Sequence, residues 1–244
     1  MKTSLHIYDT PKETVRALAE LILAKAKKKH KQSLPFNIAV SGGNTPKLLF
    51  NVLAKDYADS IPWHLVRLFW VDERCVPPNH SDSNFGMTYE TLLKQVSIHE
   101  NNIFRMQGEL DPKIEAIRYQ TLLEKELPVQ NGFPQFDLVL LGMGDDGHTA
   151  SIFPNDMSLL RSDSAVAVSI HPVTGQKRIT LTGPTIHQAL EVVFLITGET
   201  KSDLLRLIIQ HESLWENYPA AHMYSNTGPA EYYLDKAAAS KLKL

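Results

Sequence analysis

Short apolar runs that suit buried strands alternate with helix-period segments through most of this sequence. Residues 36–40 form one such run, and a helix pattern that starts at Pro46 follows it after the turn SGGNTP. An earlier helix is expected to open with the capping box Thr10-Pro11-Lys12-Glu13 and to end near a run of lysines. Alternation of this kind is typical of parallel sheets with helices on both faces. We therefore expect a single α/β domain over residues 1–244, with three α/β/α layers and a mostly parallel, Rossmann-like open sheet.

Further elements continue the alternation toward the C-terminus. Strand patterns occupy residues 66–71, 136–141, 165–170, 177–182 and 191–196. Helix patterns occupy residues 84–94, 111–126 and 200–211, and an irregular acidic segment occupies residues 72–83. The strands are expected to complete most of one sheet, whereas the part of the chain from Pro219 onward has no clear pattern.

Charge and hydropathy exclude several classes of protein. A net charge of −2 gives no basic field for nucleic acid, and the lysine cluster at residues 25–31 is interpreted as a solvated helix end. The first ten residues lack the features of a secretory signal, and no apolar run approaches the ~20 residues needed to cross a bilayer. We expect a cytoplasmic protein without a membrane or nucleic-acid partner, either a monomer or a weak homodimer.

A single cysteine, Cys75, excludes an internal disulfide and any multi-cysteine metal site. Its neighbour Arg74 would favour the thiolate and make the thiol nucleophilic. An incidental loop thiol is the preferred interpretation.

The run FDLVLLGMGDDGHTASIFP, residues 136–154, joins a buried-strand pattern to a glycine-rich turn. Ligands of open α/β sheets bind just beyond the carboxyl ends of strands. The turn glycines permit positive φ and close approach of the backbone to a ligand; they are Gly142, Gly144 and Gly147. His148 exchanges a proton near neutral pH, and Asp146 could orient its imidazole or hold a substrate hydroxyl. We interpret His148 and Asp146 as the catalytic pair.

Two other hydrolytic chemistries fit this sequence poorly. No second histidine or cysteine lies at ligand spacing around His148, so a zinc site is not indicated. No G-x-S-x-G motif occurs, so a serine-hydrolase elbow is not indicated either.

A second strand-to-helix turn has the outline of a phosphate site. Its residues offer glycine N–H groups, hydroxyls and a helix N-terminus to an anion; they are Ser41, Gly42, Gly43, Asn44 and Thr45. The turn is neither a Walker A loop nor GxGxxG, so a nucleoside triphosphate or dinucleotide is not indicated. A plain tight connection remains the alternative.

Two cations follow buried strands and could pair with a phosphate. Lys201 ends the segment TGETK, where a lysine in a first helical turn opposes the helix dipole; an exposed surface lysine is the alternative. Arg74 offers a guanidinium fork suited to phosphate. A salt bridge from Arg74 to Asp72 or Glu73 is equally compatible with the local sequence.

The motifs taken together resemble the 6-phosphogluconolactonase family. In order along the chain they are SGGNTP, FWVDERCVPPNHSDSNFGMTYETLL, GMGDDGHTASIFP, KRITLTGPTI, TGETK, YPAA and LDKAAASKL. They span nearly the whole chain, and their agreement in order and spacing makes chance improbable.

The resemblance implies both an activity and a set of site residues. Such enzymes hydrolyse 6-phospho-D-glucono-1,5-lactone to 6-phosphogluconate, the second step of the oxidative pentose phosphate pathway, without metal or organic cofactor. His148 matches the general base that activates water, with Asp146 beside it. Arg178 matches another family position, and Gly144 and Gly147 lie in the turn that approaches the substrate. N–H groups of that turn, or a nearby cation, could stabilise the oxyanion.

Two positions qualify the resemblance. Asp72 corresponds to a proton-abstracting acid of related deaminases, and here we expect it to hold a substrate hydroxyl or to make a structural bond. Asp145 stands where family members often carry proline or a small residue. The sequence leaves open whether Asp145 lies near His148, where it would favour the protonated imidazole, or points into solvent.

Two other functions are compatible with parts of this sequence. Glucosamine-6-phosphate deaminases share the fold and the D-G-H element but place a glutamate five residues after the histidine, where this chain has Phe153. A non-catalytic sugar-phosphate sensor would keep the pocket without turnover, which the intact D-G-H element and nearby cations disfavour.

Overall fold

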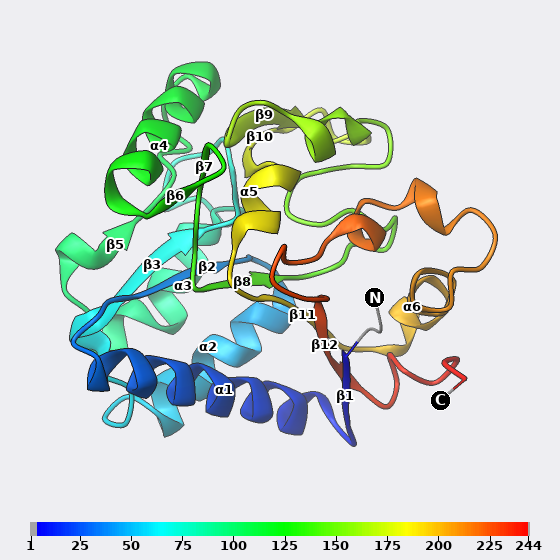
Figure 1. Ribbon diagram of the computed structural model, residues 1–244, viewed down its shortest axis with the longest axis horizontal. Coiled ribbons are helices and arrows are strands. Elements are labelled where there is room, and N and C mark those ends of the chain that lie inside the picture. Colours follow the sequence, from blue (N-terminus) through cyan, green and yellow to red (C-terminus); the bar gives the residue numbers. More distant parts are fainter. Residues whose placement is uncertain (1–3, 244) are drawn as a thin grey trace.

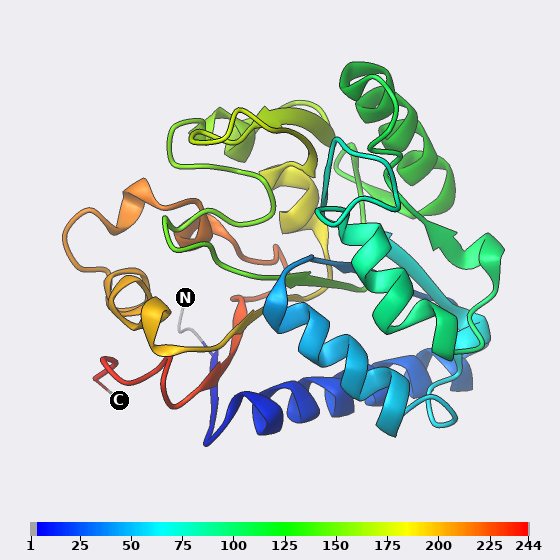
Figure 2. The same ribbon diagram turned by 180° about the vertical axis from the view of Figure 1, so that it is seen from behind.

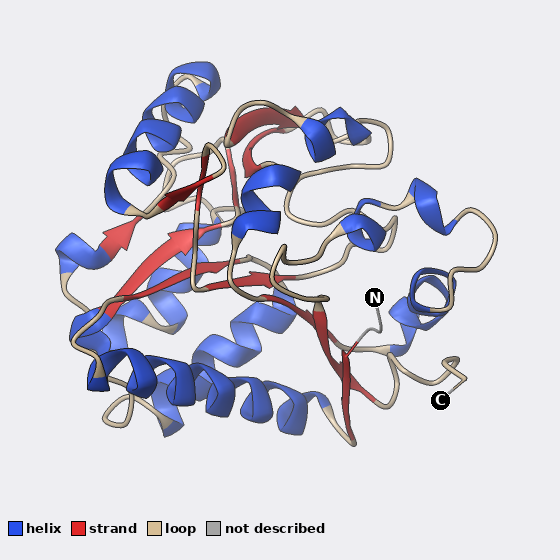
Figure 3. Cartoon of the chain, in the orientation of Figure 1, coloured by secondary structure: helices blue, strands red, loops and turns tan. Residues whose placement is uncertain are grey.

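A seven-stranded sheet forms the centre of the protein in the computed structural model, which describes residues 4–243 (Figures 1 and 3). Every pairing between neighbouring strands of this sheet is parallel. From one edge to the other the strands are β1 (Ser4–Tyr8), β12 (Glu231–Asp235), β11 (Val192–Ile196), β8 (Leu138–Leu141), β2 (Phe36–Val40), β3 (Val66–Trp70) and β5 (Ile103–Phe104). The expected α/β fold with a mostly parallel open sheet is confirmed.

Helices cover both faces of the sheet and enclose two separate apolar clusters (Figures 1 and 2). One face carries α1 (Pro11–Lys31), α2 (Asn44–Asp56) and α3 (Asn84–Thr91), whose apolar residues pack with those of the sheet. The other face carries α4 (Pro112–Glu126), α5 (Gly183–Gln188) and α6 (Ser202–Ile209). The strands between them are buried on both sides, which is why they read as continuous apolar runs.

Capping residues in the sequence determine where the two longest helices, α1 and α4, begin. The Thr10 hydroxyl accepts a hydrogen bond from the Glu13 N–H, and the Glu13 carboxylate accepts one from the Thr10 N–H, so the expected capping box is present. The Asp111 carboxylate caps α4 by accepting hydrogen bonds from the N–H groups of Lys113 and Ile114. None of the helices within residues 4–243 is long and apolar enough to span a membrane.

The lysine-rich end of α1 is more engaged than expected. Lys25 pairs with Glu191, and the Lys29 ammonium lies 2.5 Å from the buried carboxylate of Asp137. Asp137 also accepts hydrogen bonds from the backbone and side chain of Asn37. This part of the lysine run therefore ties α1 to the amino-terminal edge of the sheet instead of being fully solvated.

The expectation that residues 165–170 and 177–182 belong to the main sheet is wrong. They form β9 (Val166–Ile170) and β10 (Lys177–Leu181), which join β4 (Asp72–Arg74) in a separate antiparallel sheet. Their place in the central sheet is taken by β1 and β12, for which no expectation was made. A further hairpin joins β6 (Val129–Gln130) to β7 (Phe133–Pro134).

Helix α2 begins earlier than the sequence predicts. It begins at Asn44, two residues before Pro46, so part of the predicted turn is helical.

The surroundings of Cys75 disfavour its thiolate. Burial is the main cause and the charge of Glu73 the second, and together they raise the pKa of the Cys75 thiol to about 11. The thiolate is therefore disfavoured, which agrees with an incidental loop thiol.

Candidate active site

A cavity of about 520 Å³ opens at the carboxyl edge of the central sheet. There the loops after β2, β8 and β11 meet the small sheet formed by β4, β10 and β9. Most of the site residues expected from the sequence line it. These are Ser41, Gly42, Gly43, Asn44, Thr45, Asp72, Arg74, Gly144, His148, Arg178 and Lys201. Asp146 and Gly147 stand behind this lining, in the turn that holds His148.

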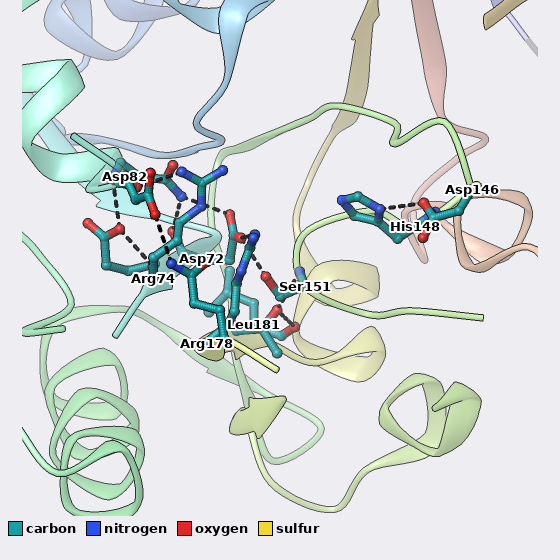
Figure 4. Close-up of polar contacts among 12 residues, drawn as sticks. Asp72, Arg74, Asp82, Asp146, His148, Ser151, Arg178 and Leu181 are labelled. Carbon is teal, nitrogen blue, oxygen red and sulfur yellow. Dashed lines mark hydrogen bonds and ion pairs between the residues drawn. The ribbon is translucent and has the colours of Figure 1, made fainter. Parts of the chain in front are cut away.

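His148 and Asp146 form a close pair (Figure 4). The Nδ1 atom of His148 lies 2.5 Å from Oδ1 of Asp146, and the same oxygen accepts a hydrogen bond from the His148 N–H. The imidazole packs against the ring of Phe153 at 4.8 Å between centroids and remains partly exposed. Its Nε2 atom has no hydrogen-bond partner among residues 4–243 and faces the side where Asp72 and Arg178 lie.

The ionisation of Asp146 suits a partner for an imidazole. Partial burial would raise the pKa of its carboxyl, but the hydrogen bond and charge of His148 outweigh that effect and lower the pKa to about 2. Asp146 is therefore ionised at any pH near neutrality. An anionic acceptor at Nδ1 keeps the proton on that nitrogen and leaves Nε2 free to accept one.

Two glycines of the turn make room for neighbouring side chains, Gly144 for this pair and Gly147 for Tyr218. A Cβ atom at Gly144 would lie 2.1 Å from Nδ1 of His148 and 2.7 Å from Oδ1 of Asp146. Gly147 has φ +80°, and a Cβ there would lie 2.5 Å from the ring of Tyr218. Gly142 and Gly144 have no positive φ, so only Gly147 confirms the expected left-handed backbone.

Two N–H groups of this turn are committed to the turn itself. Gly144 donates to the carbonyl of His148 at 2.9 Å, and Gly147 donates to the carbonyl of Gly144 at 3.2 Å. Thr149 adds a hydrogen bond from its hydroxyl to the Gly142 carbonyl. Gly144 and Gly147 therefore have no free N–H group for an oxyanion.

The first turn of α2 points its backbone into the same cavity. Its N-cap residue, Gly43, has φ +106° and provides no side-chain cap, so the first N–H groups of the helix have no side-chain acceptor. Ser41 directs its hydroxyl away, to the carbonyl of Leu140. Thr45 shares a hydrogen bond with Thr197, which ties this turn to the loop after β11. The arrangement can receive an anion at a helix N-terminus.

Asp72 and Arg178 belong to a buried polar cluster at the other side of the cavity (Figure 4). Asp72 accepts a hydrogen bond from the Ser151 hydroxyl at 2.6 Å and another from the side-chain amide of Asn84. Arg178 approaches the same carboxylate at 3.8 Å. Burial lowers the pKa of the Arg178 guanidinium, an effect that the charge of Asp72 opposes. These contacts favour a structural bond as the role of Asp72.

Arg74 has no ion pair with Asp72 or Glu73 within the described residues. Its guanidinium donates instead to the backbone carbonyl of Asp82 at 2.5 Å. Because that acceptor is neutral, it does not compensate the positive charge of Arg74 at the wall of the cavity.

Glu73 was not expected to matter, yet it organises the segment that carries Arg74. Its buried carboxylate accepts hydrogen bonds from the N–H groups of Arg74, Asn84 and Phe85 and from the Ser83 hydroxyl. Burial raises the pKa of Glu73, and the three N–H donors oppose that rise. Glu73 lies in β4, whereas most of its donors lie at the start of α3, so the local sequence gives no signal of this contact.

Replacing Glu73 with alanine is expected to destabilise the protein by about 1–3 kcal/mol, because several buried donors lose their acceptor. Urea unfolding measures the change. Glu73→Gln is the matched control, since its amide oxygen still accepts and its loss of stability should be smaller. Equal stability of parent and Glu73→Ala would show that the carboxylate does not hold this segment.

The structure gives Asp145 a partner that was not anticipated. Its Oδ1 atom lies 2.5 Å from Nζ of Lys201, the Asp145 side chain stays exposed, and among residues 4–243 Asp145 makes no hydrogen bond or ion pair with His148. Among residues 4–243, no three His, Cys, Asp or Glu side chains gather in a way that could hold a metal ion.

Comparison with known proteins decides the family. Residues 9–231 match the sequence model of the family described as glucosamine-6-phosphate isomerases/6-phosphogluconolactonase. The chain belongs to this family. It is 42% identical over 205 residues to the 6-phosphogluconolactonase of Haemophilus influenzae, which covers 84% of this chain and 86% of the relative. It is 37% identical over 236 residues to that of Aggregatibacter actinomycetemcomitans, with 96% and 98% covered.

Solved structures of the same family share the fold. The 6-phosphogluconolactonase from Trypanosoma brucei superposes with a TM-score of 0.87 and 30% identity, covering 99% of both chains. A monomeric glucosamine-6-phosphate deaminase has a TM-score of 0.81 but only 18% identity, so it supports the fold alone. The position at which such deaminases are expected to carry a glutamate is occupied in this chain by Phe153. Its side chain is buried, with 1% exposed, and packs against the His148 ring.

Proposed function

We propose that the chain hydrolyses 6-phospho-D-glucono-1,5-lactone to 6-phospho-D-gluconate, the second step of the oxidative pentose phosphate pathway. Relatives named 6-phosphogluconolactonase, up to 42% identical over most of both chains, support this activity. The observation in the site that carries it is an imidazole whose Nδ1 is held by an ionised carboxylate while its Nε2 is free at the cavity.

In the proposed mechanism, Nε2 of His148 accepts a proton from water as the water oxygen attacks the lactone carbonyl carbon. Asp146 keeps the ring oriented and stabilises the imidazolium that forms. The tetrahedral intermediate then collapses and breaks the bond between C1 and the ring oxygen. The imidazolium returns the proton to the departing oxygen, which becomes the C5 hydroxyl, and the product carboxylic acid ionises in water.

The phosphate of the substrate needs a local positive site on a protein of net charge −2. We assign that role to the N-terminus of α2 at residues 42–45, together with Arg74, Arg178 and Lys201. Ser41 would support the turn through its bond to Leu140, and Asp72 would orient Arg178. Two N–H groups of the turn, those of Gly144 and Gly147, are occupied, and we propose that a cation of the cavity wall stabilises the oxyanion.

A spectrophotometric assay on freshly made 6-phosphogluconolactone, corrected for spontaneous hydrolysis, tests the proposed activity. We expect acid release that is proportional to enzyme and persists in the presence of a chelator. Ammonia release from glucosamine 6-phosphate would indicate a deaminase instead. Binding of the sugar phosphate without turnover would indicate a sensor and contradict the proposal.

The assembly and cellular location of the protein follow as further proposals. We propose one domain over residues 1–244 that acts in the cytoplasm as a monomer or weak homodimer, without nucleic-acid or membrane partners. Sedimentation velocity at several protein concentrations checks the assembly, and a stable higher oligomer would contradict it.

A further inference from the structure

Lys201 meets a carboxylate of its own chain inside the cavity. Its side chain is largely buried, with 18% exposed, and its ammonium lies 2.5 Å from Asp145. The Asp145 side chain is 80% exposed. An exposed carboxylate can turn into solvent without disturbing the core, whereas the largely buried Lys201 side chain has much less freedom to move.

The other two cations of the cavity are held differently. Arg178 faces Asp72, a carboxylate fixed in the interior by Ser151 and Asn84. Arg74 donates to a neutral carbonyl. Of these three cations, only Lys201 is paired with a carboxylate that is free to leave.

The position of Asp145 in the chain separates it from the catalytic pair. Its neighbour Asp146 binds His148, while Asp145 reaches across to the loop after β11. The two adjacent acids therefore have different partners, and loss of the Asp145 charge leaves the contact between Asp146 and His148 in place.

We propose that Asp145 is an exchangeable counterion of Lys201, which the phosphate of substrate or product displaces on binding. This inference rests on the proposed function in assigning Lys201 to the phosphate. Every incoming phosphate must break the Asp145–Lys201 contact, so Asp145 lowers the affinity of the site. The same exchange in reverse lets the carboxylate reclaim Lys201 and favours product release.

Replacing Asp145 with asparagine is expected to tighten binding of inorganic phosphate by about two- to fivefold, the range of an exposed ion pair. Calorimetric or NMR titration of the full chain measures this Kd without any turnover. In the lactonase assay, KM should fall by a similar factor while kcat changes little. A carboxylate that merely positions Lys201 would give the opposite change, a weaker Kd and a higher KM.

Two controls separate direct exchange from a general effect of charge. Glu199→Gln removes one negative charge from the segment that carries Lys201. Glu199 is exposed and makes no ion pair within the described residues. Its phosphate Kd should stay at the parent value. Asp145→Asn should also have no effect on the phosphate Kd once Lys201 is replaced by methionine.

An unchanged or weaker phosphate Kd in Asp145→Asn would overturn the exchange, and so would an equal gain in Glu199→Gln or in the Lys201→Met background. Asp145→Ser repeats the comparison with a shorter side chain. Absence of lactone hydrolysis in the parent would refute the proposed function but would leave the phosphate titration decisive for Asp145.

Discussion

Replacing His148 with alanine is expected to lower kcat about 10²–10⁴-fold while KM changes little. The imidazole Nε2 is the proposed acceptor of the proton from water, whereas the proposed phosphate site lies elsewhere in the cavity. Loss of the base therefore removes stabilisation of the transition state and leaves most of the ground-state binding intact. Initial rates on fresh lactone, corrected for spontaneous hydrolysis, give both constants.

His171 offers a matched control for this substitution. Its ring packs on Phe153, the same aromatic side chain that supports His148, with 5.2 Å between centroids. His171→Ala therefore removes an imidazole from the same neighbourhood without removing the proposed base, and kcat should change far less. Equal turnover by the parent and His148→Ala would exclude His148 as the general base.

The second large effect is expected from Gly144→Ala. The added methyl would stand 2.1 Å from Nδ1 of His148 and 2.7 Å from Oδ1 of Asp146, so the contact between the two side chains must be disturbed. Displacement of a catalytic group by about 1 Å can cost on the order of 10²-fold in rate, and we expect kcat to fall at least that far. The backbone of Gly144 lies outside the positive-φ region, so the loss should come from the imidazole and not from backbone strain.

Gly142→Ala is the control within the same turn. A Cβ atom at Gly142 would meet nothing within 4 Å, so His148 should stay in place and kcat should fall much less than in Gly144→Ala. Thermal unfolding of both variants checks that the fold is retained. If Gly144→Ala kept the parental kcat, close contact between the turn and the imidazole would not be needed for catalysis.

The parts of the fold that local patterns specify were predictable from the sequence. The strand, turn and helix of residues 36–56 are read from an apolar run, two glycines and a helical period. By contrast, β1 is an edge strand of half-buried residues, and β12 has acids at both ends, so neither forms an apolar run. The small sheet depends on pairing between β4 and β10, which are distant in sequence and have no local signal.

In the site, too, contacts between segments distant in sequence could not be predicted. The sequence placed Asp146, His148, Arg74 and Lys201 at strand ends, because the carboxyl edge of a parallel sheet gathers such loops. It could not show that Lys201 meets Asp145 or that Arg74 meets the Asp82 carbonyl, because those contacts depend on how separate loops lie in space. The role of Glu73 was missed for the same reason.

A crystal structure of the parent protein with 6-phosphogluconate bound tests the proposed site most directly. We expect the C1 carboxylate within hydrogen-bond distance of Nε2 of His148, and the phosphate against the N-terminus of α2 with Lys201 turned toward it. A product bound with its carboxylate remote from His148, or with its phosphate beside that imidazole, would contradict the assignment of base and anchor.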